Sequence, residues 1–193
     1  AVTPEQSNTE YFKASATIAS SGSIALLANN LGYNGTGYKV SITSDGVETG
    51  KTFTITGLRV GSNASNVSPQ VETLSGPSAG IVYSANYYTS IQSISVDAGS
   101  AGGVKIGFGG DMALPRARIK SGFYLSASTA GTITFTAKPS NTVILKLPTG
   151  GDTSVHNIII PGEGILTTKG SNDDYAVITM SQVATSNITL FCG

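Results

Sequence analysis

The sequence predicts an all-β protein with antiparallel strands, arranged as a β-sandwich or a jelly-roll-like fold. Apolar residues alternate with hydroxyl-bearing residues over many short runs, which is the pattern of strands with one buried face. These runs recur about every 8–12 residues, with turn signals between them, as in sandwiches and barrels. Charged residues make up only 11% of the chain, so we expect outward faces that carry hydroxyls.

Residues 38–58 show this alternation most clearly. Every second residue in two of its runs is large and apolar: Tyr38, Val40, Ile42, Phe53 and Ile55. Successive side chains on a strand point to opposite faces, so each run offers one face to a core. The intervening residues 44–50 contain an Asp-Gly pair and a second glycine, which favour a turn. We therefore predict a β-hairpin here.

Two later runs depart from simple alternation. Between residues 87 and 96, Ile91 is out of phase with Ile94, and a β-bulge between them would restore the phase. Ile158–Ile160 is continuously apolar, which indicates a strand buried on both faces or a strand at an interface. Other residues are expected to alternate inward after residue 115: Ala117, Ile119, Phe123, Leu125, Ile133, Phe135 and Ala137.

The chain is predicted to form an N-terminal arm and two small β-domains. Residues 1–10 are mostly polar and are predicted to be an extended arm, because they bury too little apolar surface to fold alone. Glycines and a proline interrupt the pattern between residues 109 and 115. We expect a β-sandwich domain at residues 11–110 and a second sandwich or barrel-like domain at residues 111–193. Two short strands are expected within residues 11–31.

The charge balance excludes some partners. Eleven basic and eleven acidic residues give a formal net charge of zero, whereas nucleic-acid binding requires clustered Lys and Arg. We expect no nucleic-acid partner. The densest basic run, Arg116, Arg118 and Lys120, is interpreted as a solvated or interface face of one strand. Low net charge also removes the repulsion that keeps monomers apart, so it favours a homo-oligomer or a larger assembly.

Neither a membrane span nor a remaining signal peptide is predicted. The chain has no apolar run of about 18 residues and no basic segment followed by an apolar stretch near Ala1. The initial alanine fits removal of an initiator methionine, and it fits processing of a precursor equally well. Cys192 is the one cysteine, so no internal disulfide can form.

The sequence contains no catalytic constellation, and we expect no enzyme activity, cofactor or metal. Gly50-Lys51-Thr52 resembles the end of a phosphate-binding loop, but Asp45 stands where the first glycine should be, and a strand follows. His156 has Asp152 nearby but no G-x-S-x-G segment, so it is interpreted as structural. Asp173-Asp174 lies in a predicted turn and offers oxygen ligands for calcium, but the spacing of the neighbouring residues matches no calcium-binding pattern.

Tyr83, Tyr87 and Tyr88 form the one candidate contact patch. Exposed aromatic rings bind sugars and protein surfaces, so this cluster would carry a glycan-binding function. The alternative is an aromatic seam between strands.

Two segments resemble proteins of tailed-bacteriophage virions. From Val40 to Gly110 the order is a strand of the type S-I-T-S, then G-K-T-F-T-I-T-G, E-T-L-S-G-P, a tyrosine-bearing strand and S-I-S-V before a glycine-rich close. The segments I-P-G-E-G-I at Ile160–Ile165 and I-T-L-F-C-G at Ile188–Gly193 are similar to closing strands of small phage structural domains. The resemblance implies a role in particle architecture.

On this basis we expect a non-enzymatic structural protein of a bacteriophage virion, assembled in the host cytoplasm. Decoration or cementing of the capsid exterior is the first expectation, with the major capsid protein and other virion proteins as partners. A tail- or fibre-associated module that binds host-surface glycans is the alternative.

Overall fold

The structure is a computed structural model, and it describes residues 7–30, 36–61, 68–168, 175–181 and 187–192. Every regular element in these residues is a β-strand, and the strand pairs run antiparallel. The prediction of an all-β, antiparallel fold is therefore confirmed. No helix in the described part of the chain is long and apolar enough to cross a membrane.

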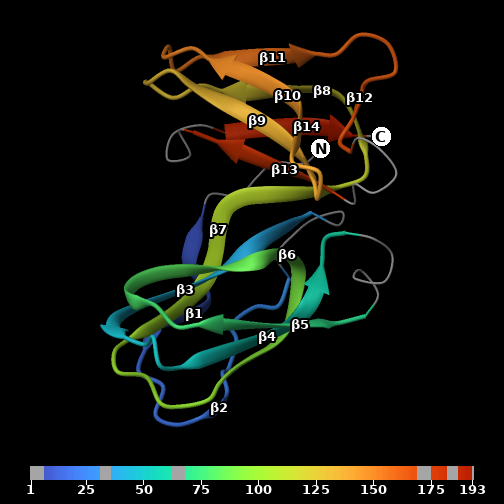
Figure 1. Cartoon of the computed structure of the whole chain (residues 1–193). Helices are drawn as coiled ribbons and strands as arrows, with labels where there is room; N and C mark the ends of the chain where they lie inside the picture. The colour runs from blue at the N-terminus through green and yellow to red at the C-terminus, as the bar shows by residue number, and fades with distance from the viewer. Residues whose placement is uncertain (1–6, 31–35, 62–67, 169–174, 182–186, 193) are drawn as a thin grey trace. The chain divides into compact units, whose positions relative to one another are not determined.

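Contacts within the chain group it into two compact units, each built from strands (Figure 1). The N-terminal unit holds the described residues up to Gly109, and the C-terminal unit holds those from Gly110 onwards. The sequence prediction divides the chain between residues 110 and 111. Independent folding of residues 11–110 and 111–193 stays a prediction.

The strands follow one another with short connections. Those that begin in the N-terminal unit are β1 (Asn8–Ala16), β2 (Gly22–Ser23), β3 (Gly37–Val47), β4 (Thr52–Arg59), β5 (Gln70–Ser75), β6 (Ser78–Val96) and β7 (Val104–Pro115), and β7 ends in the C-terminal unit. Those of the C-terminal unit are β8 (Arg118–Leu125), β9 (Gly131–Lys138), β10 (Thr142–Thr149), β11 (Val155–Ile159), β12 (Ile165–Leu166), β13 (Tyr175–Met180) and β14 (Asn187–Cys192).

The long strand β6 organises the N-terminal unit. Its residues 78–88 pair with β3 and its residues 88–96 pair with β4. The predicted hairpin is therefore wrong: β3 and β4 are both strands, but each pairs with β6 in the described residues. The physical reason lies in the supposed turn. Asp45 and Gly46 belong to β3 itself, and the Asp45 carboxylate accepts a hydrogen bond from Gly103 N at 2.7 Å.

Alternate residues of these strands form the core as predicted. Large side chains of the N-terminal unit that are almost fully buried include Phe12, Tyr38, Val40, Ile42, Phe53, Ile55, Ile94, Ile106 and Phe108. The predicted bulge is confirmed, because Ile94 lies opposite Ile55 whereas Ile91 lies opposite Gly57, with a register shift between the two pairs. Both isoleucines are consequently buried.

Strand β1 begins inside the predicted N-terminal arm. Asn8 pairs with Phe108 of β7, and the Glu10 carboxylate lies 2.7 Å from the Lys105 ammonium. Residues 8–10 of the predicted arm therefore belong to a strand that pairs with β7, and residues 1–6 lie outside the described part of the chain. Polar residues join the sheet here because strand pairing uses backbone groups, which need no apolar side chain.

Gly107→Ala is expected to loosen β1. A Cβ at position 107 would overlap the backbone of Asn8 and Thr9, so β1 would have to move. We expect hydrogen exchange of the β1 amides to rise at least tenfold, because their partners on β7 move away. Gly50→Ala is the control, since a Cβ there meets open space. If the β1 amides of Gly107→Ala were as well protected from hydrogen exchange as those of the wild type, Gly107 would not lie close to the β1 backbone.

The C-terminal unit is built from the strands of two sheets (Figure 1). In one sheet β10, β9, β13 and the end of β7 are neighbours in that order. In the other, β11 and β12 follow one edge of β8 while β14 follows the opposite edge. The buried faces carry Ile133, Phe135, Ala137 and Ala176 in the first sheet and Ile119, Tyr124, Ile158, Ile188 and Leu190 in the second.

Candidate functional site

The outer side of the β8 sheet is apolar although it faces away from the core. Tyr124, Ile158 and Leu190 point inward and are buried. Side chains one position away on the same strands point to the opposite face. Large apolar residues on that face are exposed: Phe123, Leu125, Val155, Ile159 and Phe191. We call these five residues the outer apolar face.

The register of the strands makes this face continuous. Ile159 of β11 and Phe191 of β14 both lie opposite Ser121 of β8. The ring centre of Phe123, two residues further along β8, is 6.3 Å from that of Phe191. Val155 continues the face along β11. Cross-strand neighbours on one side of a sheet touch, so the five side chains form one patch.

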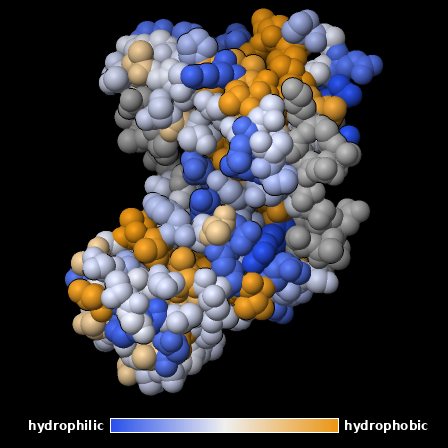
Figure 2. Space-filling view, viewed as in Figure 1, coloured by the Kyte–Doolittle hydropathy of each residue, from blue (hydrophilic) through white to orange (hydrophobic). Residues whose placement is uncertain are grey.

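The outer apolar face is comparable in size to the largest apolar patch of a typical monomer, which is often functional. Ile159 is 83% exposed and Val155 is 65% exposed. The five residues together expose on the order of 500 Å² of apolar surface, taking roughly 200 Å² for each fully exposed large side chain. Figure 2 shows apolar residues gathered near the end of β11. Patches of this size commonly mark an interaction surface.

Two sequence predictions about this sheet are corrected by the structure. Simple alternation placed Phe123 and Leu125 on the face of Ile119, and this is wrong. A bulge at Lys120, where the register between β8 and β14 shifts, inverts the phase. Burial of Ile158–Ile160 on both faces is also wrong, because β11 pairs along one edge and turns Ile159 to solvent. The other interpretation, a strand at an interface, stays a prediction.

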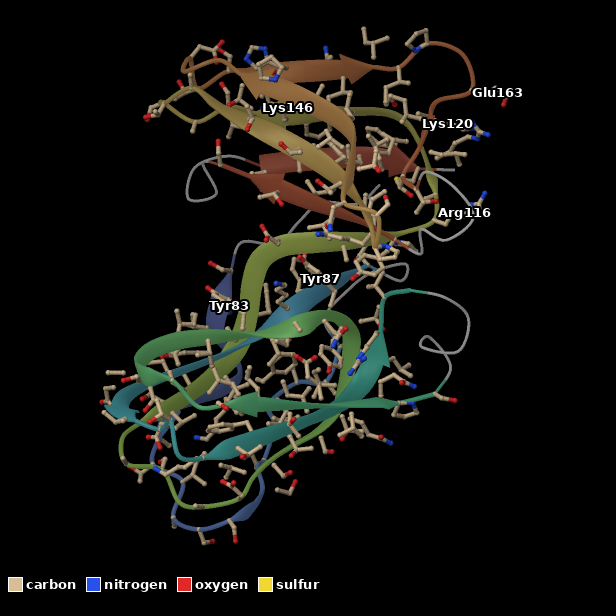
Figure 3. The ribbon with its side chains drawn as sticks, viewed as in Figure 1. Tyr83, Tyr87, Arg116, Lys120, Lys146 and Glu163 are labelled. Carbon is tan, nitrogen blue, oxygen red and sulfur yellow. The ribbon has the colours of Figure 1, made fainter. Side chains whose placement is uncertain are left out.

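One end of the outer face is basic. Arg116 and Lys120 are exposed, and Arg118 lies 3.9 Å from the carboxylate of Glu163. Figure 3 shows Arg116, Lys120 and Glu163 on the same side of the C-terminal unit. Three basic residues and one acidic residue give this end a positive charge.

At the opposite end of β8, Asp152 connects two side chains. It accepts a hydrogen bond from the Ser126 hydroxyl, and its Oδ1 lies 3.1 Å from Nε2 of His156. The His156 ring stacks on Tyr124 with ring centres 4.9 Å apart. The hydrogen bonds from Ser126, His156 and the Ser154 backbone hold the pKa of Asp152 well below its usual range.

This group contains the three residue types of a hydrolase triad, but in a different order. A triad places histidine between the nucleophile and the carboxylate, so that the ring takes the hydroxyl proton. Here the carboxylate stands between them, and the Ser126 hydroxyl donates to Asp152. Ser126 is also buried. The arrangement ties the ends of β8 and β11 together, and the hydroxyl is bound to the carboxylate and not to the imidazole.

Ser126 is accordingly expected to be unreactive. Incubating the intact protein with a fluorophosphonate probe at neutral pH should give the same background labelling as Ser126→Ala, because no imidazole removes the hydroxyl proton. Intact-mass spectrometry measures the labelled fraction. Labelling above background that disappears in Ser126→Ala would show an activated serine.

Sequence reasoning missed a buried carboxylate at the corner between β3 and β4. Glu48 is 0% exposed, and its carboxylate binds Lys51 and accepts hydrogen bonds from Ser44 Oγ at 3.1 Å and Gly102 N at 3.0 Å. Burial by itself raises the pKa of Glu48, but these bonds and that from Ala101 N outweigh it and lower the pKa to about 2. The carboxylate is saturated with donors, so it is a structural anchor.

The three predicted patch tyrosines do not share one surface. Tyr83 is 45% exposed, whereas Tyr88 is 0% exposed and Tyr87 is also buried. The Tyr88 hydroxyl donates to Glu72 at 2.9 Å, and burial together with the Glu72 charge raises the Tyr88 pKa. The two buried rings match the alternative interpretation, a seam between strands.

Other candidate sites offer little chemistry. Lys51, of the loop resembling a phosphate site, is bound to Glu48, and Thr52 begins β4. Two open grooves of about 380 and 350 Å³ share Asn29 and Gln92, and no ionisable side chain lines either. The described residues contain no group of three potential metal ligands. Asp173-Asp174 lies outside the described residues.

Comparison with known proteins identifies no relative of this chain. No family model, no curated protein and no solved structure matches the chain.

Proposed function

We propose that this chain is a non-enzymatic structural protein of a bacteriophage virion that decorates or cements the capsid exterior. The observation that carries the proposal is the outer apolar face. An apolar sheet face of this extent is unfavourable in water and is stabilised when another protein surface covers it. A subunit held in a shell by such burial needs no reactive group.

The charge balance supports the same role. A formal net charge of zero lets many copies stand close together without mutual repulsion. The order of strand motifs from Val40 to Gly110, similar to phage virion proteins, supports a particle as the assembly. The glycan-binding alternative has less support, because Tyr87 and Tyr88 are buried.

Reconstruction of the phage particle that encodes the chain tests this proposal. We expect density for this protein on the outer surface of the head, with the β8 sheet against a neighbouring protein chain. Particles assembled with the gene deleted should lose DNA at lower temperature than complete particles, because the added contacts are missing. Finding the protein on the tail, or absent from purified particles, would contradict the proposal.

A further inference from the structure

We propose that the outer apolar face is covered by the same face of a second copy of this chain, with the two β8 strands antiparallel. This inference rests on the assembly role proposed above and names the partner at that surface. Three features of the described residues support a second copy as the partner: the size of the face, its shape and the charges at its two ends.

The size of the face suits a symmetric dimer. The exposed apolar surface, on the order of 500 Å², is interspersed with polar side chains of the same sheet such as Asn157 and Thr189, which both lie opposite Phe123. Together they approach the roughly 800 Å² per partner that stable complexes bury. An isologous contact uses the same patch on both molecules, so one patch supplies the whole interface.

The shape of the face also suits a second copy. It is the outer side of a sheet, and two sheets pack face to face at a separation of about 10 Å when both faces carry apolar side chains. Phe123 and Phe191 project from neighbouring strands near the middle of the face. In a face-to-face pair these rings would interdigitate with their counterparts and lose their contact with water.

Charge complementarity favours one orientation of the two copies. The basic end, Arg116, Arg118 and Lys120, lies at the start of β8, and the half-exposed Asp152, whose carboxylate also binds Ser126 and His156, lies beyond its end. The seven residue steps of β8 separate these ends by about 23 Å, which is too far for them to pair within one molecule. With antiparallel β8 strands, the Asp152 of each copy lies next to the Lys120 of the other. Parallel strands would place like charges together.

Sedimentation equilibrium of the full chain tests the dimer. We expect a dimer with a dissociation constant in the micromolar range or tighter, as is usual for interfaces of this size. Ile159→Asp should weaken association at least tenfold, because it introduces two charges into the buried face. Ile159 is 83% exposed, so the monomer fold should survive, which far-UV circular dichroism checks. Phe123→Ser is a second variant, and Tyr83→Asp, on the N-terminal unit, is the control.

Zero-length carbodiimide cross-linking tests the orientation. An amide bond between Lys120 and Asp152 can form only between copies, because Asp152 binds Ser126, six residue steps or about 20 Å along the strand from Lys120. We expect this cross-linked peptide in the dimer fraction of the wild type, identified by mass spectrometry. We expect it to be lost in Ile159→Asp.

A wild-type chain that is still monomeric at a protein concentration of about 100 μM would overturn the inference. A dimer that persists in both Ile159→Asp and Phe123→Ser would overturn it too. A dimer without the Lys120–Asp152 cross-link would overturn the antiparallel orientation. These measurements need no phage particle. If the purified chain is monomeric but is found on the head surface, only the dimer inference is contradicted. If the chain dimerises but is absent from particles, only the proposed function is contradicted.

Discussion

The Glu48→Gln protein is expected to lose about 3 kcal/mol of unfolding free energy at neutral pH. The ionised carboxylate accepts bonds from Ser44, Ala101 and Gly102 and is paired with Lys51. The glutamine side chain would place its NH₂ group, a donor, against the backbone N–H groups, which are also donors. It would also leave the Lys51 ammonium without its counter-ion. The lowering of the Glu48 pKa from 4.5 to about 2 corresponds to about 3 kcal/mol at about 1.4 kcal/mol per unit.

The same anchor predicts a particular dependence on pH. The pKa of Glu48 is lower in the folded chain than in the unfolded chain, so its contribution is complete above about pH 4.5. Protonation of the unfolded chain removes that contribution as the pH falls from 4.5 towards 2. The difference in unfolding free energy between wild type and Glu48→Gln should therefore shrink by about 2 kcal/mol between pH 7 and pH 3.

Urea unfolding at a series of pH values measures both effects. Glu10→Gln is the matched control, because Glu10 is an exposed carboxylate paired with Lys105 on the same unit. Its removal should change the unfolding free energy by less than about 1 kcal/mol. If Glu48→Gln were as stable as Glu10→Gln at pH 7, the stability of the corner between β3 and β4 would not depend on the charge of Glu48.

Phe108→Ala is expected to cost about 3–5 kcal/mol of unfolding free energy. Phe108 is 1% exposed, and its ring centre lies 5.1 Å from that of Tyr11 and 4.9 Å from that of Tyr38. These rings belong to β1, β3 and β7, so the substitution leaves a cavity where three strands meet. The lost burial and the cavity both destabilise the N-terminal unit.

Tyr83→Ala is the matched aromatic control for Phe108→Ala. Tyr83 belongs to the same unit but is 45% exposed, so we expect a loss below about 1 kcal/mol. Thermal or urea unfolding followed by tyrosine fluorescence compares the two proteins. Equal losses would mean that the aromatic cluster around Phe108 is not packed as described.

Alternation predicted which residues are buried better than it predicted which strands pair. Tyr38, Val40, Phe53 and Ile55 were expected to face inward, and they do. Nothing in residues 38–58 indicates that the later strand β6 takes both runs as partners. A period-two pattern shows which side chains share one face of a strand, but it does not show which strands pair, because pairing depends on the whole chain. The bulge beside Ile91 could be predicted because it interrupts that pattern.

The residues that matter most at the candidate site were harder to predict. A single bulge at Lys120 inverts the phase of β8, so Phe123 and Leu125 looked like core residues. The sequence signal that could have revealed them is the continuous run Ile158–Ile160, which one buried face cannot accommodate. Glu48 gave no signal, because burial of a carboxylate depends on donors from Ala101 and Gly102, which are distant in the sequence.

Hydroxyl-radical footprinting of the protein, free and in its native particle, tests the central claim most directly. The account predicts that oxidation of Phe123 and Phe191 falls at least fivefold on assembly relative to the dilute free chain, because another protein surface covers the outer apolar face. Equal oxidation of both phenylalanines in the particle and in the free chain would contradict it.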